Sequence, residues 1–193
     1  RCWVADYGAD AVALRDHVGW DRARVVGISF GGMVAQEVAV TVPERVERLA
    51  LLCTSPGGPD RASYPLHELA DLPPDEAAAT GLALLDTRFT PEWLASHPSD
   101  QALVEMVASR RAGSDDPEVA RGKGEQLGAR AGHDVCDRLD RITCPTLVAG
   151  GRYDGIAPPA NSEAIAERIA GADLRFYEGG HAFLAQDPAA FPD

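Results

Sequence analysis

The sequence is short of lysine, of long apolar runs and of closely spaced cysteines. Lys123 is the only lysine among 18 basic residues, which face 30 acidic residues, so the formal net charge is −12. A chain of this charge repels polyphosphates, and we expect no nucleic-acid partner. No apolar run approaches the length of a membrane-spanning helix, and no charged leader with an apolar core follows Arg1. We therefore expect neither a membrane partner nor a signal peptide.

The cysteines and most of the histidines show no ligand spacing. Cys2, Cys53, Cys136 and Cys144 form no CxxC pair and have no histidine cluster beside them. This pattern favours reduced core side chains and a cytoplasmic protein, and it predicts no metal site and no cofactor. Surface or packing roles are expected for four scattered histidines, His17, His67, His97 and His133.

Helical and strand patterns alternate at both ends of the chain. Near the N-terminus the order is a helix over 6–18, a strand over 24–28, a helix over 31–39 and a strand over 48–53. Near the C-terminus it is a strand over 146–150, a helix over 159–169 and a strand over 173–177. Short apolar strands that alternate with helices predict an α/β fold with a parallel sheet.

Strand patterns are missing between residues 56 and 142. Helical segments are expected there over 75–85, 91–97, 99–111 and 117–130. We predict three parts: a core over 1–55, an inserted helical cap over 56–142 and a second piece of core over 143–193. Phe89 and Trp93 lie in the predicted cap, where packing between helices is favoured over lining a substrate pocket.

The stretch from Gly27 to Gly31 has the pattern of a nucleophile elbow, with Ser29 at the turn from strand to helix. The serine backbone is strained in such a turn, so we expect bulk to be excluded at both Gly27 and Gly31. The helix that follows points its free N–H groups back at the serine, which favours an oxyanion there. The alternative is an ordinary turn serine.

Two further polar residues directly follow predicted strands. Asp154 comes after the strand over 146–150, and His181 after the strand over 173–177. Carboxyl ends of parallel strands share one edge of a sheet, so Ser29, Asp154 and His181 are expected to meet. A serine needs an imidazole to take its proton, and the imidazole needs a carboxylate to orient it. The alternatives are a helix-capping Asp154, a surface His181, and Asp60 as the acid.

These motifs resemble the α/β-hydrolase family, in the cap-bearing branch that includes enol-lactonases, small esterases and carbon–carbon bond hydrolases. The resemblance is carried by 27–32, 43–49, 144–148 with Asp154, and Gly180-His181 with Gln186-Asp187-Pro188. It implies that Ser29 is the nucleophile, His181 the general base and then acid, and Asp154 the orienting carboxylate. The backbone N–H of Phe30 would be an oxyanion donor.

The resemblance favours hydrolysis of a small carboxylic ester or lactone, so the expected partner is a small-molecule substrate. Serine at the elbow disfavours epoxide hydrolases and haloalkane dehalogenases, which need an aspartate there. A carbon–carbon bond hydrolase, a cofactor-free perhydrolase and a non-catalytic binding module remain as alternatives. The predicted cap holds 16 acidic and 9 basic residues, which disfavours polyanionic substrates such as coenzyme A esters.

Relatives of this family have strands before the elbow and an early loop that supplies the second oxyanion N–H. This chain enters at the helix before the elbow, so the resemblance predicts a fragment of a longer protein. Loss of one oxyanion donor costs about 3 kcal/mol, and an unpaired strand over 24–28 would expose an apolar edge prone to association. We therefore expect the printed chain to be unstable or inactive alone.

Overall fold

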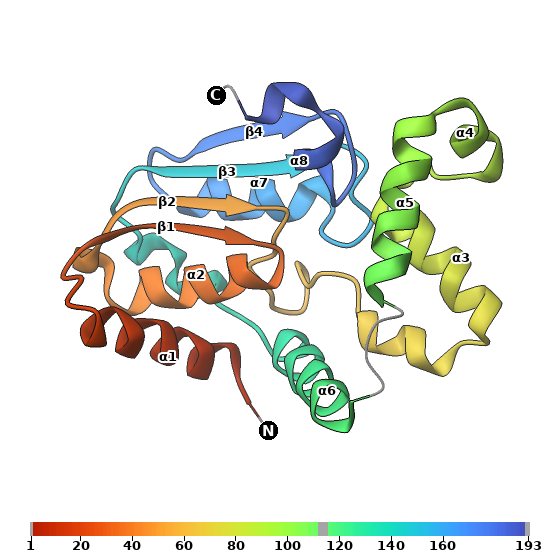
Figure 1. Cartoon of the computed structure of the whole chain (residues 1–193). Helices are drawn as coiled ribbons and strands as arrows, with labels where there is room; N and C mark the ends of the chain where they lie inside the picture. The colour runs from red at the N-terminus through yellow and green to blue at the C-terminus, as the bar shows by residue number, and fades with distance from the viewer. Residues whose placement is uncertain (1, 112–115, 192–193) are drawn as a thin grey trace.

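Four parallel strands form one sheet in the order β1-β2-β3-β4. The computed structural model describes residues 2–111 and 116–191. The strands are β1 (Ala23–Ile28), β2 (Val46–Leu52), β3 (Thr146–Gly151) and β4 (Asp173–Tyr177). The predicted α/β class with a parallel sheet is confirmed, and all four strands end at one edge of the sheet (Figure 1).

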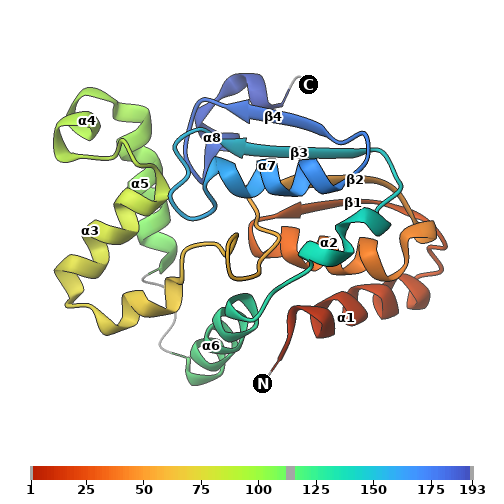
Figure 2. The ribbon, with the colours of Figure 1, turned by 180° about the vertical axis from the view of Figure 1, so that it is seen from behind.

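The helices fall into two groups. The helices around the sheet are α1 (Val4–His17), α2 (Phe30–Thr41), α7 (Pro159–Arg168) and α8 (Phe183–Gln186), and those between β2 and β3 are α3 (Pro74–Leu85), α4 (Pro91–Ser96), α5 (Pro98–Arg111) and α6 (Pro117–Ala131). Short 3-10 turns are η1 (Pro43–Arg45), η2 (Leu66–Asp71), η3 (Cys136–Arg141) and η4 (Pro188–Ala190). Helices α2 and α7 lie against the same face of the sheet, and α1 lies beyond α2 (Figures 1 and 2).

The main core lies between the sheet and the α2–α7 layer. Leu51 of β2 and Ile165 of α7 are fully buried there, and Val38 of α2 is 3% exposed. Leu139 and Ile142 belong to the same cluster and are at most 1% exposed. The end of the segment predicted as cap thus passes beneath the sheet and contributes to this core before β3 begins.

Helices α3, α4 and α5 stand together beyond the carboxyl ends of the strands, whereas α6 lies separately, near the start of α1 (Figures 1 and 2). All four helices begin at proline, a residue that fits the first helical turn because no intrahelical N–H bond is needed there. A small apolar core of Leu85, Phe89, Leu94 and Leu103 holds α3, α4 and α5 together, and Trp93 packs against it. Phe89 and Trp93 therefore pack between the helices, as expected.

The opposite face of the sheet is only partly covered. Phe183 of α8 stacks on Tyr177 of β4 with ring centroids 5.3 Å apart. At the other side β1 is the edge strand of the described chain, and its Val26 and Ile28 are 65% and 50% exposed. The association expected through this edge stays a prediction. Within the described ranges, no helix is both long and apolar enough to cross a membrane.

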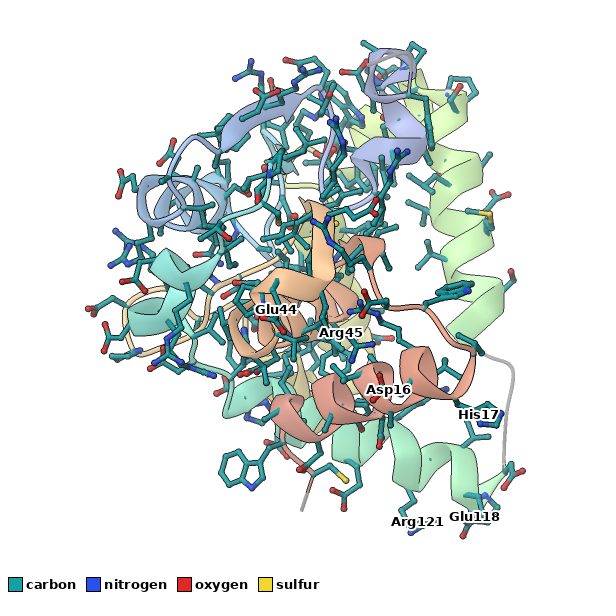
Figure 3. All side chains as sticks on the ribbon, turned by 90° about the vertical axis from the view of Figure 1, so that its left-hand side faces the viewer. Asp16, His17, Glu44, Arg45, Glu118 and Arg121 are labelled. Carbon is teal, nitrogen blue, oxygen red and sulfur yellow. The ribbon has the colours of Figure 1, made fainter. Side chains whose placement is uncertain are left out.

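Basic side chains join α1 to the segment that leads into β2. Arg45 of η1 lies 2.6 Å from the Asp16 carboxylate of α1, and Figure 3 shows the two side chains facing each other. Arg15 is buried and donates to the carbonyl oxygens of Asp21 and Arg45. The helix before the first strand is thus fixed at the end of the sheet opposite to Ser29.

Candidate active site

Ser29 occupies a strained turn between β1 and α2. Its φ of 53° and ψ of −118° lie in a region that residues with a side chain rarely adopt. A Cβ added at Gly27 would lie 2.5 Å from the carbonyl oxygen of Gly31, too close for any side chain. The expected exclusion of bulk at Gly27 is therefore confirmed.

The expectation for Gly31 is wrong. A Cβ there would meet no described atom within 4 Å, whereas a Cβ at Gly32 would lie 2.5 Å from the Thr54 Cβ. Thr54 also donates from Oγ1 to the Ser29 carbonyl oxygen at 2.8 Å. The tight glycine is Gly32, because Thr54 at the end of the neighbouring strand closes on it. The sequence of the turn alone carries no signal for that contact.

Ser29, His181 and Asp154 form one hydrogen-bonded line. His181 Nε2 lies 2.8 Å from Ser29 Oγ, and His181 Nδ1 lies 2.8 Å from Asp154 Oδ2. A carboxylate can only accept, so Nδ1 carries the proton and Nε2 is left to accept from the serine hydroxyl. The three residues meet at the carboxyl ends of the strands, although 152 positions separate Ser29 from His181.

The two oxygens of Asp154 have different partners. Oδ1 accepts from the backbone N–H groups of Ile156 and Ala157, each at 2.8 Å, while Oδ2 faces His181. The residue is 2% exposed, and α7 has no side-chain cap at its start. Asp154 therefore shapes its own loop rather than capping the helix. Asp60 lies exposed in the loop after β2.

The C-terminal end of α3 is hydrogen-bonded to the loop that carries His181 and to the loop that carries Asp154. The backbone N–H of His181 donates to the Leu85 carbonyl at 2.7 Å, and that of Gly155 donates to the Leu84 carbonyl at 3.1 Å. The backbone N–H of Thr87 donates to the Tyr153 carbonyl at 2.9 Å. The segment 84–87 thus ties the histidine loop to the Asp154 loop.

Asp86, in the middle of that segment, has a fully buried carboxylate. Arg88 donates to it from Nε at 3.0 Å and from Nη2 at 2.7 Å. Gln186 donates to the same carboxylate at 2.9 Å and accepts the N–H of Gly180 at 2.9 Å. We call Asp86, Arg88 and Gln186 the cap clasp. No pattern in the sequence indicates a role for Asp86, and the sequence analysis includes Gln186 only as part of a family motif.

A pocket of about 280 Å³ opens beside Ser29. Its lining residues are Ser29, Phe30, Leu66, Lys123, Gln126, Leu127 and Arg130. Three larger hollows lie on the partly covered face of the sheet, between α3 and α5, and between α1 and the end of α2, and none of them is lined by Ser29, Asp154 or His181. The pocket that adjoins the serine is thus walled largely by α6.

The remaining histidines and cysteines lie outside the hydrogen-bonded line of Ser29, His181 and Asp154. His133 is buried, and desolvation together with the charge of Arg138 lowers its pKa to about 4. All four cysteines are free, but only Cys53 is a buried core residue and Cys2 is exposed, so the expectation of core positions holds for one of them. Burial raises the pKa of the Cys53 thiol to about 12. Among the described residues, no group of three or more potential ligands could hold a metal ion.

Comparison with known proteins assigns the family. A family model described as the alpha/beta hydrolase fold matches residues 4–188, and the chain therefore belongs to the α/β-hydrolase fold family. It is 28% identical over 193 residues to 3-oxoadipate enol-lactonase 2 of Acinetobacter baylyi, which covers 97% of this chain and 67% of that protein. It is 27% identical over 189 residues to a pyrrolizixenacetamide deacetylase of Xenorhabdus hominickii, which covers 97% and 69%.

The solved structures give the same assignment. A hydrolase from Pseudomonas aeruginosa PA01 superposes with a TM-score of 0.73 at 28% identity, covering 98% of this chain and 69% of that one. The chain thus spans about two thirds of the length of these relatives. The relatives are hydrolases, and the chain is an enzyme of that kind within this fold.

Proposed function

We propose that this protein hydrolyses a small carboxylic ester or lactone, with Ser29 as the nucleophile. The observation that carries the proposal is the pair of 2.8 Å contacts that connects the serine hydroxyl to His181 and His181 to Asp154. This geometry supplies what a serine lacks at neutral pH, namely a base within hydrogen-bond reach and a carboxylate that orients the base.

Acylation follows from these contacts. The Ser29 hydroxyl gives its proton to His181 Nε2 as Oγ bonds to the substrate carbonyl carbon, and the carbonyl oxygen becomes an oxyanion. The N–H of Phe30, the first residue of α2, has no acceptor within the helix and would donate to that oxyanion. His181 then returns the proton to the leaving oxygen as the C–O bond breaks, which leaves an acyl group on Ser29.

Deacylation repeats the sequence with water. His181 takes a proton from the water as its oxygen bonds to the acyl carbon, and it gives the proton back to Ser29 Oγ when the acyl–serine bond breaks. Asp154 keeps its charge and balances the imidazolium in both halves. The Asp154 residue is 2% exposed, so little water screens its carboxylate from the ring.

Two observations support a small substrate. The pocket beside Ser29 measures about 280 Å³, at the low end for small-molecule sites. The name of the Acinetobacter relative also denotes an enol-lactonase, an enzyme that opens a small cyclic ester.

Because α6 supplies four of the seven lining residues, we propose that the segment 56–142 acts as a cap over the site. The four free cysteines support our proposal of a reducing compartment, the cytoplasm.

Covalent labelling tests the nucleophile. A fluorophosphonate carrying a short alkyl chain should label the wild-type protein, tested here and below at its full natural length, at one serine, found by peptide mass spectrometry at Ser29. Ser29→Ala should remove the label, and His181→Ala should slow labelling by at least about 100-fold because the base is lost. Ser55→Ala is the matched control, since Ser55 is buried and outside the line. Labelling at another serine, or none in folded protein, would overturn the proposal.

A further inference from the structure

One face of α6 looks into the pocket that holds Ser29. Lys123, Gln126, Leu127 and Arg130 all line that pocket, and their spacing of three, four and seven residues is that of a single helix face. Arg121 lies on the same helix but pairs with Glu118 and is not part of the lining. Figure 3 shows Arg121 and Glu118 together on the outer side of α6.

The charge of this face is opposite to that of the chain. The lining contains Lys123 and Arg130 and no acidic residue, although the chain has a net charge of −12. Within residues 2–111 and 116–191, no carboxylate oxygen lies within 4.0 Å of the charged nitrogens of these two side chains. Lys123, the only lysine in the sequence, thus lines the same pocket as the candidate nucleophile and has no carboxylate counter-ion among the residues that the structure describes.

Arg130 is the better-held of the two cations. It is half-buried, and its Nη1 donates to the backbone carbonyl of Tyr64 at 2.6 Å. The N–H of Tyr64 in turn donates to the Ile156 carbonyl, two residues after Asp154. Burial lowers the pKa of Arg130 to about 10, with Asp154 acting in the opposite direction, so the guanidinium stays charged at neutral pH. A cation that is partly removed from water, and whose hydrogen-bond acceptor among the described residues is a neutral carbonyl, gains much from an anion that arrives with a ligand.

We propose that the substrate carries a free carboxylate, which Arg130 and Lys123 bind while the ester or lactone carbonyl lies at Ser29. This inference rests on the proposed function and names its substrate class. Arg130 sets the position of the carboxylate, because its Nη1 is fixed on the Tyr64 carbonyl. No described residue accepts a hydrogen bond from its Nε or Nη2, which can make a two-point contact with a carboxylate. Lys123 is exposed and adds a screened charge at the rim.

A monovalent carboxylate fits better than a phosphate. The lining offers one guanidinium, one exposed ammonium and no second arginine, in a pocket that also holds the apolar Phe30, Leu66 and Leu127. The acidity of the whole chain further opposes a doubly charged group. A short apolar chain that ends in one carboxylate matches this lining of two basic and several apolar side chains.

The test uses two esters that differ only at the far end. One is the mono-p-nitrophenyl ester of adipic acid, which has a free carboxylate, and the other is the same ester with that carboxylate methylated. Wild-type protein should prefer the free acid by at least about tenfold in kcat/KM, chiefly through KM, for a charge-assisted contact of this kind. Arg130→Gln should bring the ratio of the two kcat/KM values close to one, and Arg130→Lys should restore part of it. Lys123→Gln should lower the ratio by about threefold, and added salt should mimic that change.

Arg121→Gln is the matched control, because it removes an equal charge from the outer side of the same helix and should leave the ratio unchanged. A second readout needs no turnover: adipate should protect Ser29 from the alkyl fluorophosphonate better than 1,6-hexanediol does, and Arg130→Gln should abolish the difference. A preference for the methylated ester, or a loss with Arg130→Gln that is equal for both esters, would overturn the carboxylate assignment. Failure to hydrolyse either ester or to label Ser29 would instead count against the proposed function.

Discussion

The two walls of the pocket beside Ser29 are built in different ways. On one side, loops at the strand ends hold Ser29, Asp154 and His181, which are joined by hydrogen bonds. Backbone hydrogen bonds fix these loops, and Asp154 is itself buried. On the other side stands α6, most of which is exposed, with Ala129 packed on Val4 and Met33 as its buried anchor. Reactive groups thus come from rigid backbone, and recognition groups come from side chains on a helix at the rim. Variants on the two walls should accordingly affect different kinetic constants.

The largest expected effect falls on the strand-end wall. Asp154→Asn keeps the shape of the loop but removes the charge that orients and stabilises the His181 imidazolium. We expect kcat for ester hydrolysis to fall by about 10³ to 10⁴-fold with little change in KM. Steady-state kinetics on p-nitrophenyl esters measures this.

Asp60→Asn is the control for that experiment, because Asp60 is the exposed acid that the sequence offers as an alternative partner. Its kcat should stay within about twofold of wild type, as for an exposed charge far from the reacting atoms. The reverse result, with Asp60→Asn inactive and Asp154→Asn active, would refute the assignment of the acid.

The second-largest effect tests whether the cap clasp stabilises the contact between the end of α3 and the loop that carries His181. Asp86→Ala leaves Arg88 and Gln186 without their shared, fully buried carboxylate. We expect the free energy of unfolding to fall by about 3 kcal/mol, at the lower end for a broken buried pair because Arg88 is itself 21% exposed. Urea unfolding at pH 7 gives the value.

Glu178→Ala is the matched variant, since that carboxylate also approaches Arg88, at 3.9 Å, but is 61% exposed. It should change the free energy of unfolding by no more than about 0.5 kcal/mol. Equal stability of the Asp86 variant and wild type would mean that the clasp does not hold the proposed cap, residues 56–142, on the core.

A smaller effect depends on pH and on His133, where the chain returns from α6 to the core. The folded pKa of about 4 lies below the ordinary value of 6.5, so the unfolded chain takes up this proton first as the pH falls. The stabilising contribution is complete above pH 6.5 and is lost between pH 6.5 and 4. From pH 7.5 to 5.0, wild type should lose about 2 kcal/mol more than His133→Leu does.

Urea unfolding of both proteins at the two pH values measures this difference. Glu37, with its carboxylate 4.0 Å from the ring, and the nearby Arg138 and Asp134 are common to both proteins, so their titration cancels to first order. His17→Gln, on the exposed side of α1, should follow wild type. A parallel loss in wild type and His133→Leu would show that His133 takes up its proton normally in the folded state.

The same contrast between the walls explains what the sequence could predict. The strand over 173–177 agrees with β4 to the residue, and the strand over 24–28 differs from β1 by one residue. Short apolar runs bounded by glycine and charged residues predict strands from local sequence alone. The residues that directly follow such strands are therefore predicted to lie at the edge of the sheet where the strands end. The role of Arg130 depends on a carbonyl 66 positions away, and that of Asp86 depends on Gln186, 100 positions away. Contacts between distant segments leave no periodicity, so the recognition wall and the clasp could not be predicted.

The smallest expected effect concerns the nucleophile elbow itself, where the sequence analysis predicts that both Gly27 and Gly31 exclude bulk. Gly31→Ala places a methyl group in open space on a helical residue, so the free energy of unfolding should rise by no more than about 1 kcal/mol and the rate of Ser29 labelling should be unchanged. Gly27→Ala drives a Cβ to 2.5 Å from the Gly31 carbonyl oxygen and should lose both stability and labelling. Urea unfolding and fluorophosphonate kinetics on the two variants decide the matter. If Gly31→Ala behaved like Gly27→Ala, a group outside the described residues would have to pack against the elbow, and the turn would be as tight on both sides as the sequence implied.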